Sequence, residues 1–241
     1  MNDRINFVDQ GQVIDFMASL MRRPDVCVVG VSGFAGAGKT TLCETTVSAY
    51  PEQVVRLNCD LFSAFSIQER RERIDNAFAS GNPEVIEAEM NPRNWYDWKG
   101  IHHAIDGLRQ RRAFETNKAW NHTTGLLDAH YSKALPPAGP VVVLCDCIFL
   151  LHEPVRTWLE HSLLVQSSHD AIAVRRSNRA KDKEAERQAR ERQERFEVPY
   201  FERHSEYADI VFQDSSLVCP DAGKRASSDL AAVRHSYAGS G

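Results

Sequence analysis

The chain has 241 residues, of which 42% are hydrophobic and 26% charged, and its formal net charge is −4. These values are typical of a globular protein that can bury a full core, and they give no reason to expect nucleic acid or an anionic membrane as the main partner. No apolar run approaches the length of a membrane span, and the first residues contain no apolar signal core. We therefore expect a cytoplasmic protein and leave open whether it forms a homodimer.

The first predicted elements lead into a glycine-rich loop. Apolar residues at helical spacing predict a helix over 12–22, and the valine-rich segment 26–31 predicts a buried strand. The next residues, from Gly33 to Thr40, fit the spacing G-x-x-x-x-G-K-[ST] without a mismatch. Residues from 41 to about 49 can form the helix that this motif requires after it.

The glycine-rich motif indicates a site for the phosphates of a nucleotide. Glycines permit backbone conformations in which successive N–H groups surround an anion, and the following helix points its positive end at the same place. Lys39 would reach the β- and γ-phosphates, and the Thr40 hydroxyl would ligate Mg²⁺. A glycine-rich turn without a ligand is the alternative. The predicted nucleotide-binding residues are Gly33, Phe34, Ala35, Gly36, Ala37, Gly38, Lys39, Thr40 and Thr41.

Strands and helices alternate along the rest of the chain. Further strands are expected over 54–59, 141–151, 163–165 and 208–212. Further helices are expected over 68–78, 83–90, 101–111, 153–159, 168–196 and 196–206, whereas 91–98 and 112–131 show no helical period. This alternation predicts a three-layer α/β/α fold with a mostly parallel central sheet. We expect a single domain over 1–216, with a helical lid at about 175–197, and a flexible C-terminal tail over 217–241.

Two aspartates fall at or near the ends of predicted strands, where ligands of parallel sheets bind. Asp60 directly follows the strand 54–59, where it could accept the proton of a substrate hydroxyl or simply cap a turn. Asp146 lies within the strand 141–151, where a charge is costly unless it is paired or binds a cation. Beside a phosphate loop, these positions favour Asp60 as the catalytic base and Asp146 as a Mg²⁺ ligand together with Thr40.

An arginine-rich segment opens the expected lid. Arg175 and Arg179 are four residues apart and share a helix face, and Arg176 is next to the first of them. Arginines above a triphosphate can neutralise the charge of the transferring group. We therefore assign Arg175 and Arg176, with Lys39, to catalysis and Arg179 to nucleotide binding. The mixture of Glu and Arg that follows is typical of a solvated helix face.

Two polar and aromatic segments, 91–98 and 120–125, are left to bind the phosphate acceptor. Aromatic rings can stack on a sugar or a base, and Asn, His and Arg side chains can bind hydroxyls. Packing of these aromatic side chains between sheet and lid is the alternative. The candidate substrate-binding residues are Arg93, Trp95, Tyr96, Asp97, Trp120 and His122.

Taken in order, these motifs resemble those of the P-loop kinase superfamily that contains uridine kinase, phosphoribulokinase and pantothenate kinase. The resemblance rests on residues 33–41, 58–62, 144–149, 174–176 and 207–211. It implies an ATP- and Mg²⁺-dependent kinase that phosphorylates a hydroxyl of a small metabolite, such as a sugar, a sugar phosphate, a nucleoside or a pantothenate-like compound. It also implies that Asp60 is the catalytic aspartate and that Arg175 and Arg176 are the paired arginines of the lid.

The chain departs from the pattern of this family in three places. Asp146 and Cys147 stand where these kinases usually carry Glu and Gly, and Ile172 replaces an earlier lid arginine. Arg93 stands where uridine kinases carry the aspartate that holds the ribose. An arginine cannot accept hydrogen bonds from hydroxyls, but it can bind an anionic acceptor. We therefore predict a divergent member whose substrate is neither uridine nor cytidine.

Other classes of function are weighed against a kinase. A GTPase-type switch is disfavoured because the closest match to its Asn-Lys-x-Asp motif, at residues 117–120, lacks the acid. A regulatory or non-catalytic nucleotide-binding module stays open because of the departures from the family pattern. A role with nucleic acid rests only on the arginine-rich helix, where the interspersed glutamates oppose it.

Overall fold

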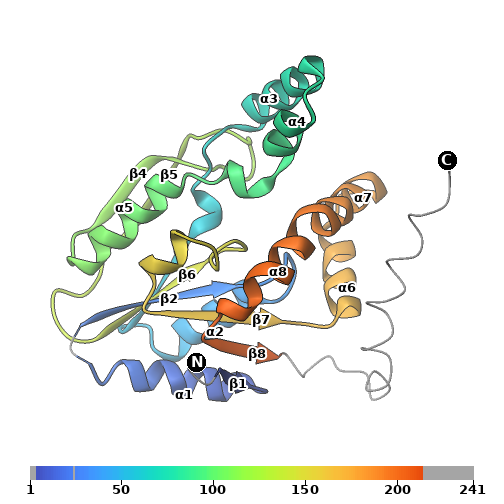
Figure 1. Cartoon of the computed structure of the whole chain (residues 1–241). Helices are drawn as coiled ribbons and strands as arrows, with labels where there is room; N and C mark the ends of the chain where they lie inside the picture. Colours follow the sequence, from blue (N-terminus) through green and yellow to red (C-terminus); the bar gives the residue numbers. More distant parts are fainter. Residues whose placement is uncertain (1–3, 24, 214–241) are drawn as a thin grey trace.

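The computed structural model describes residues 4–23 and 25–213. Its main sheet has six strands in the order β1-β8-β7-β2-β6-β3, and all neighbouring strands are parallel (Figure 1). The strands are β1 (Ile5–Phe7), β2 (Val26–Ser32), β3 (Val54–Asn58), β6 (Val141–Asp146), β7 (His161–Gln166) and β8 (Ile210–Gln213). The predicted tail at 217–241 lies outside the described residues.

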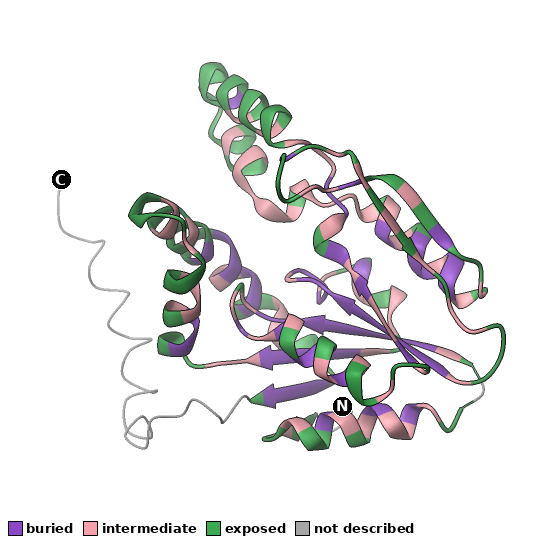
Figure 2. Cartoon of the chain, turned by 180° about the vertical axis from the view of Figure 1, so that it is seen from behind, coloured by how far each residue is buried: buried purple, intermediate pink, exposed green. Residues whose placement is uncertain are grey.

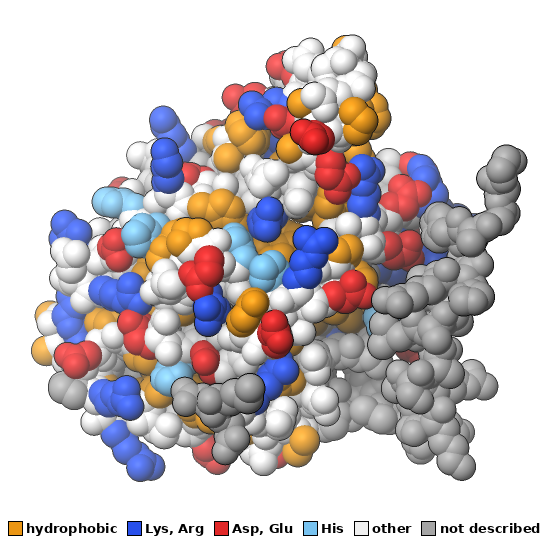
Figure 3. All heavy atoms as spheres, viewed as in Figure 1, with side chains coloured by type: hydrophobic (Ala, Val, Ile, Leu, Met, Phe, Trp, Pro, Cys, Tyr) orange, Lys and Arg blue, Asp and Glu red, His pale blue; other side chains and the backbone are white. Residues whose placement is uncertain are grey.

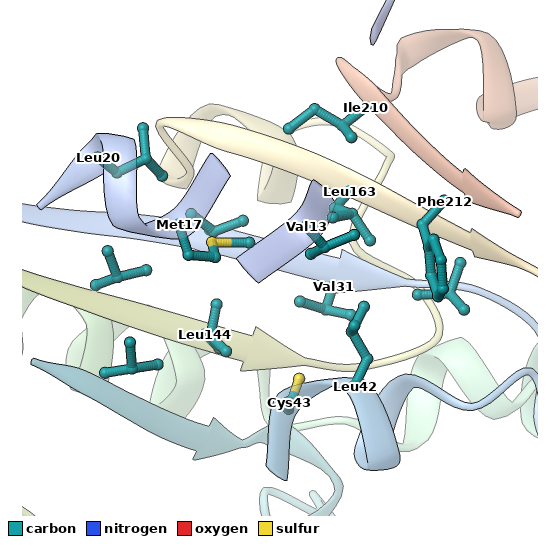
Figure 4. Close-up of a cluster of buried hydrophobic side chains, with 14 of the residues drawn as sticks. Val13, Met17, Leu20, Val31, Leu42, Cys43, Leu144, Leu163, Ile210 and Phe212 are labelled. Carbon is teal, nitrogen blue, oxygen red and sulfur yellow. The ribbon is translucent and has the colours of Figure 1, made fainter. Parts of the chain in front are cut away.

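Helices cover both faces of the sheet. They are α1 (Gln10–Leu20), α2 (Lys39–Ala49), α3 (Ile67–Ser80), α4 (Pro83–Met90), α5 (Trp98–Arg109), α6 (His169–Arg179), α7 (Lys183–Arg192) and α8 (Val198–His204). Side chains of a strand point alternately to opposite faces. Val29 and Val31 of β2 accordingly join α1 and α2 in one core cluster, part of which is drawn in Figure 4, whereas Val28 joins α5 in another. The predicted three-layer α/β/α fold is confirmed.

The central strands contribute most of their residues to the hydrophobic core between these layers. Every residue of β6 is buried, as are all but the first of β2, which is why the strands are drawn mostly in purple in Figure 2. On the face that carries α5, a further cluster joins α8 to Leu164 of β7 and Val211 of β8. Strands buried on both faces form near-continuous apolar runs, which explains why they could be predicted from the sequence.

The segment after β6 differs from the prediction. We expected a strand over 141–151, but β6 ends at Asp146 because its neighbours also end there: β2 pairs with it up to Val31 and β3 up to Asn58. The apolar residues that follow leave the sheet and pack into the core, with Phe149 and Leu151 among the α8 side chains. A 3₁₀ turn at Val155–Trp158 replaces the short helix expected over 153–159.

The expected helix over 168–196 is broken into parts. α6 ends at Arg179, and α7 begins after Asp182, whose side chain accepts a hydrogen bond from the Ala185 N–H as a helix cap. A π-helical turn at Gln193–Glu197 then leads into α8. These breaks could not be predicted from the sequence, because the stretch is charged throughout. An aspartate in it could equally cap a helix or lie on a solvated helix face.

Three further segments refine the prediction. β1 was not expected, because three residues with a polar one in the middle give no strand pattern, yet they pair with β8 at the sheet edge. The extended region 112–131 contributes an antiparallel hairpin of β4 (Phe114–Ala119) and β5 (Ala129–Lys133). Residues 91–98, expected to be irregular, contain a 3₁₀ turn at Pro92–Trp95.

Two helical arms extend beyond the sheet. α3 and α4 form one arm and α6 and α7 the other, as Figure 1 shows. Arg195, in the π-helical turn, connects them, because its guanidinium pairs with Glu87 of α4 and Nη1 lies 3.5 Å from the sulfur of Met90. Within 4–23 and 25–213, no helix has the length and apolar character needed to cross a membrane.

Candidate active site

The predicted phosphate loop connects β2 to α2. Gly33, Gly36 and Gly38 have φ angles of 149°, 87° and 101°, in the left-handed region that favours glycine. A Cβ atom on Gly33 would also lie only 2.5 Å from the carbonyl oxygen of Val165, so no side chain fits there. Gly38 caps α2 without a side chain, which leaves the first N–H groups of an eleven-residue helix open toward the loop. This is the geometry of an anion-binding site.

Lys39 is held inside the loop. Its side chain is buried, and its ammonium group donates hydrogen bonds to the carbonyl oxygens of Gly33 (2.9 Å) and Phe34 (3.0 Å). The next residue, Thr40, donates from its hydroxyl to Asp146 Oδ2 at 3.1 Å, and Thr41 is exposed in the first turn of α2. The structure therefore brings Lys39, Thr40 and Asp146 together at one end of the sheet.

Asp146 is almost completely buried at the end of β6, and Arg56 of β3 neutralises it. Arg56 Nη2 lies 2.5 Å from Asp146 Oδ2 and 3.3 Å from Thr40 Oγ1, and Nη1 reaches Glu44. Burial acts against the charge of Arg56, but the Asp146 carboxylate outweighs it and raises the arginine pKa. Sequence reasoning missed Arg56, although an arginine inside an apolar strand is the same signal that singled out Asp146.

Thr40 and Asp146 supply oxygen atoms of the kind that Mg²⁺ prefers, and these lie 3.1 Å apart, joined by a hydrogen bond. Arg56 Nη2 contacts the same oxygen of Asp146. Among the described residues, no group of three or more His, Cys, Asp or Glu side chains could hold a metal ion alone. Magnesium is usually held by one or two protein ligands together with substrate phosphates and water, so this sparse donor set suits an ion that binds with a nucleotide.

Asp60 lies in a 3₁₀ turn, Cys59–Leu61, directly after β3. The Tyr96 hydroxyl donates a hydrogen bond to its Oδ1 at 2.9 Å. Asp60 is exposed to solvent, yet the protein around it raises its pKa by desolvation, while the charge of Lys39 and the Tyr96 hydrogen bond lower it. Asp146 adds a smaller upward effect. The two predicted carboxylates and Lys39 therefore lie within electrostatic reach of one another.

The three arginines of the predicted lid are placed differently from one another. Arg175 Nη1 donates to the carbonyl oxygen of Gly36 in the phosphate loop and to Ser167 Oγ, each at 3.1 Å. Arg176 donates to Gln193 in the π-helical turn, and Arg179 is exposed at the end of α6. Of the three, Arg175 is the one that directly contacts the loop.

Glu197 is a second residue that the sequence did not reveal. It ends the π-helical turn, it is buried, and its Oε2 accepts a hydrogen bond from the Ala35 N–H at 2.8 Å. Burial raises the pKa of this carboxyl group, and the Ala35 N–H and the charge of Lys39 act in the opposite direction. It was overlooked because it belongs to a run of charged residues that is typical of a solvated surface.

The candidate acceptor residues do not all meet at Asp60. Tyr96 contacts it directly, whereas the Trp95 and Trp120 rings contact Arg70, with their centres 5.0 and 4.5 Å from its guanidinium carbon. Asp97 Oδ1 instead accepts from the Gly100 N–H as the cap of α5. His122 is exposed in the turn after β4, and among the described residues it forms no hydrogen bond or ion pair with Asp60. Arg93 lies within electrostatic reach of two histidines, His152 and His204.

Backbone hydrogen bonds fix the acceptor side to the turn that carries Asp60. The Trp120 N–H donates to Leu61, the Asp97 N–H to Phe62 and the Ala64 N–H to Trp95, all at 2.8–2.9 Å. Three segments that are distant in sequence thus form one frame.

On the face drawn in Figure 3, positive and negative side chains are interspersed over the coloured surface.

A parallel sheet that ends in a glycine-rich phosphate loop, with a lysine and two carboxylates beside it, defines a P-loop nucleotide-binding fold. The model of the Phosphoribulokinase / Uridine kinase family matches residues 28–219. The chain belongs to this family. No curated protein matches the chain by sequence comparison.

Solved structures of similar proteins share the fold. D-glycerate 3-kinase from Cryptococcus neoformans has a TM-score of 0.56 and 14% identity, with 82% of this chain and 89% of that chain covered. A protein named as a possible uridine kinase from Bacillus stearothermophilus has a TM-score of 0.52 and 17% identity, with 83% and 99% covered. Phosphoribulokinase from Rhodobacter spheroides has a TM-score of 0.53 and 11% identity, with 78% and 70% covered.

The buried ion pair between Arg56 and Asp146 has a measurable consequence for stability. We expect Arg56→Leu to lower the free energy of unfolding by about 3 kcal/mol, because it leaves a buried carboxylate without its cation. Arg73→Leu, which removes the more exposed pair with Glu89, should cost about 1 kcal/mol or less. Urea unfolding of both variants gives the comparison, and equal losses would show that Arg56 does not stabilise Asp146.

The hydrogen bond from Tyr96 predicts a shift of the Asp60 pKa. The bond stabilises the charged carboxylate, so Tyr96→Phe should raise this pKa further. NMR titration of the aspartate carboxyl carbons measures it, with Asp60→Asn to assign the signal and Tyr50→Phe as a distant control. A pKa that stays in place or falls in Tyr96→Phe would contradict the assigned role of this hydroxyl.

Proposed function

We propose that the protein is an ATP- and Mg²⁺-dependent phosphotransferase that moves the γ-phosphate of ATP to a hydroxyl group of a small metabolite. The observation that carries the proposal is the position of Asp60. Its carboxylate lies within electrostatic reach of Lys39 in the phosphate loop and is hydrogen bonded to Tyr96 on the acceptor side. A base in this position would lie next to both the γ-phosphate and the hydroxyl group of the acceptor.

Each residue has a role in the proposed reaction. The open N–H groups of the loop and Lys39 bind the triphosphate, for which the ammonium group leaves the carbonyl oxygens of Gly33 and Phe34. Thr40 and Asp146 would hold the metal ion, which would share the Asp146 carboxylate with Arg56. When bound, Mg²⁺ neutralises the negative charge that develops on the phosphate oxygens. Arg175, already on the loop, adds a further positive charge beside the transferring group.

Asp60 supplies the base for the transfer. It accepts the proton of the acceptor hydroxyl while that oxygen forms a bond to the γ-phosphorus, and the bond to the β-phosphate oxygen breaks to release ADP. Desolvation raises the Asp60 pKa, which makes its carboxylate a better proton acceptor than an ordinary aspartate. The acceptor would lie against Tyr96, Trp95 and Trp120, which the backbone frame holds next to Asp60.

The similar structures support a small acceptor without naming it. They include proteins named as kinases of uridine and of D-glycerate, so this fold accommodates different acceptors. Arg93, half-buried on the acceptor side, is a candidate for contact with an anionic acceptor. Asp97 and His122 stay predictions, since one is a helix cap and the other lies on an exposed turn.

Replacing Asp60 tests the proposal. Asp60→Asn keeps the shape of the side chain but removes the base, so acceptor-dependent turnover should fall about 100- to 10,000-fold while ATP binding persists. ADP release is measured with sugars, sugar phosphates, hydroxy acids, nucleosides and pantothenate as acceptors. Asp75→Asn, an exposed aspartate of α3, is the matched control. Undiminished turnover in Asp60→Asn would rule out this aspartate as the base.

A further inference from the structure

Arg70, near the start of α3, has an unusual environment. Its guanidinium carbon contacts two indole rings, 5.0 Å from the centre of Trp95 and 4.5 Å from that of Trp120. Its Nη2 donates to Ser63 Oγ at 2.5 Å. Both indole rings therefore lie within cation–π distance of the guanidinium group.

The charge of Arg70 has no carboxylate partner among the described residues. Its neighbour Arg73 pairs with Glu89, and Arg56 pairs with Asp146, but no ion pair of Arg70 exists within 4–23 and 25–213. Its Nε is buried without a hydrogen-bond acceptor, and burial lowers the pKa of the group. Contact with aromatic faces offsets part of the loss of hydration, yet the donors of a guanidinium require acceptors.

The position of Arg70 relates it to the candidate base. Ser63 forms an antiparallel bridge with Tyr96, the residue after Trp95. The Trp120 N–H donates a hydrogen bond to the carbonyl oxygen of Leu61, the residue after Asp60. The hydroxyl of Tyr96 donates a hydrogen bond to Asp60, and Tyr96 also lies within electrostatic reach of Arg70. An anion bound to Arg70 would therefore lie beside the acceptor segments that are hydrogen bonded to the turn after Asp60.

We propose that Arg70 binds an anionic group of the acceptor while Asp60 receives its hydroxyl. This inference rests on the proposed function and names its substrate class: a hydroxylated metabolite that carries a carboxylate or a phosphate ester. The Nη1–Nη2 edge supplies the donors, because Nη1 has no acceptor among the described residues and is not among the buried unpaired atoms. Fork-shaped donors of this kind match carboxylate and phosphate oxygens.

Intrinsic tryptophan fluorescence tests the proposal without any turnover, because two indoles contact Arg70. The probes are D-glycerate and D-ribose 5-phosphate, each compared with its neutral counterpart, glycerol or D-ribose, at constant ionic strength. The native protein should respond saturably to at least one anionic probe and to neither neutral compound. The two anionic probes distinguish a carboxylate site from a phosphate site.

Variants of two neighbouring arginines locate the binding. Arg70→Met should weaken binding of the anionic probe about tenfold or more, whereas Arg73→Met, on the same helix, should leave it unchanged. Arg70→Lys, which keeps the charge but not the fork, should be intermediate and guards against a folding defect in the first variant. A merely structural Arg70 would lower the melting temperature without changing the affinity.

Several results would overturn the inference. They are the absence of a response to both anionic probes, equal binding of neutral and anionic probes, and undiminished binding in Arg70→Met, which would place the anion elsewhere, for example in the phosphate loop. Failure of phosphoryl transfer with intact, Arg70-dependent binding would instead refute the proposed reaction alone. Efficient turnover of a neutral acceptor would refute the anion site and leave the reaction standing.

Discussion

The parallel register of β2, β6 and β3 is the constraint on which the site depends. Val31 and Asn58 are both aligned with Asp146, so β3 and β6 end at the same level and β2 ends one residue further on. The phosphate loop follows β2, Asp60 follows β3, and Asp146 closes β6. A shift of one residue in either pairing would turn side chains to the opposite face and separate these groups. The buried valines that set this register therefore also set the geometry of the site.

Most charged groups of the site are already paired within the protein. Lys39 donates to loop carbonyls, Arg56 to Asp146, and Arg175 to Gly36, while Glu197 accepts from Ala35. Nucleotide binding on this account exchanges partners: phosphate oxygens replace carbonyl oxygens as acceptors for Lys39. Arg70 differs, because no described carboxylate compensates it, and this contrast is what points to an anion on the acceptor side.

The sequence predicted those parts of the site that depend on local spacing. The loop from Gly33 to Thr40 has a fixed pattern, and Asp60 and Asp146 stand out because they follow or close apolar strands. Arg56 and Glu197 were missed because their partners lie 90 and 162 residues away in the chain, and only the fold brings them together. The division of the predicted 168–196 helix was missed for a related reason. An aspartate such as Asp182 occurs on exposed helix faces as well as at helix caps, and the sequence alone does not distinguish the two.

The same distinction applies to the acceptor side. Tyr96 and Trp120 were selected as aromatic residues without periodicity, and the structure joins them through the backbone frame around Leu61 and Phe62. Asp97 was selected by the same reasoning, but its carboxylate caps α5, a role that aspartate fills in many helices. Composition can therefore identify a segment that forms a site, while the direction of each side chain requires the tertiary contacts.

A crystal structure of the protein with Mg²⁺ and a non-hydrolysable ATP analogue tests the central claim most directly. Our account predicts that the triphosphate lies in the loop from Gly33 to Thr40. Lys39 Nζ should have moved from the carbonyl oxygens to the phosphates, and Asp60 should face the γ-phosphate across the space for an acceptor hydroxyl. A nucleotide bound elsewhere, with Lys39 still hydrogen bonded to Gly33 and Phe34, would contradict it.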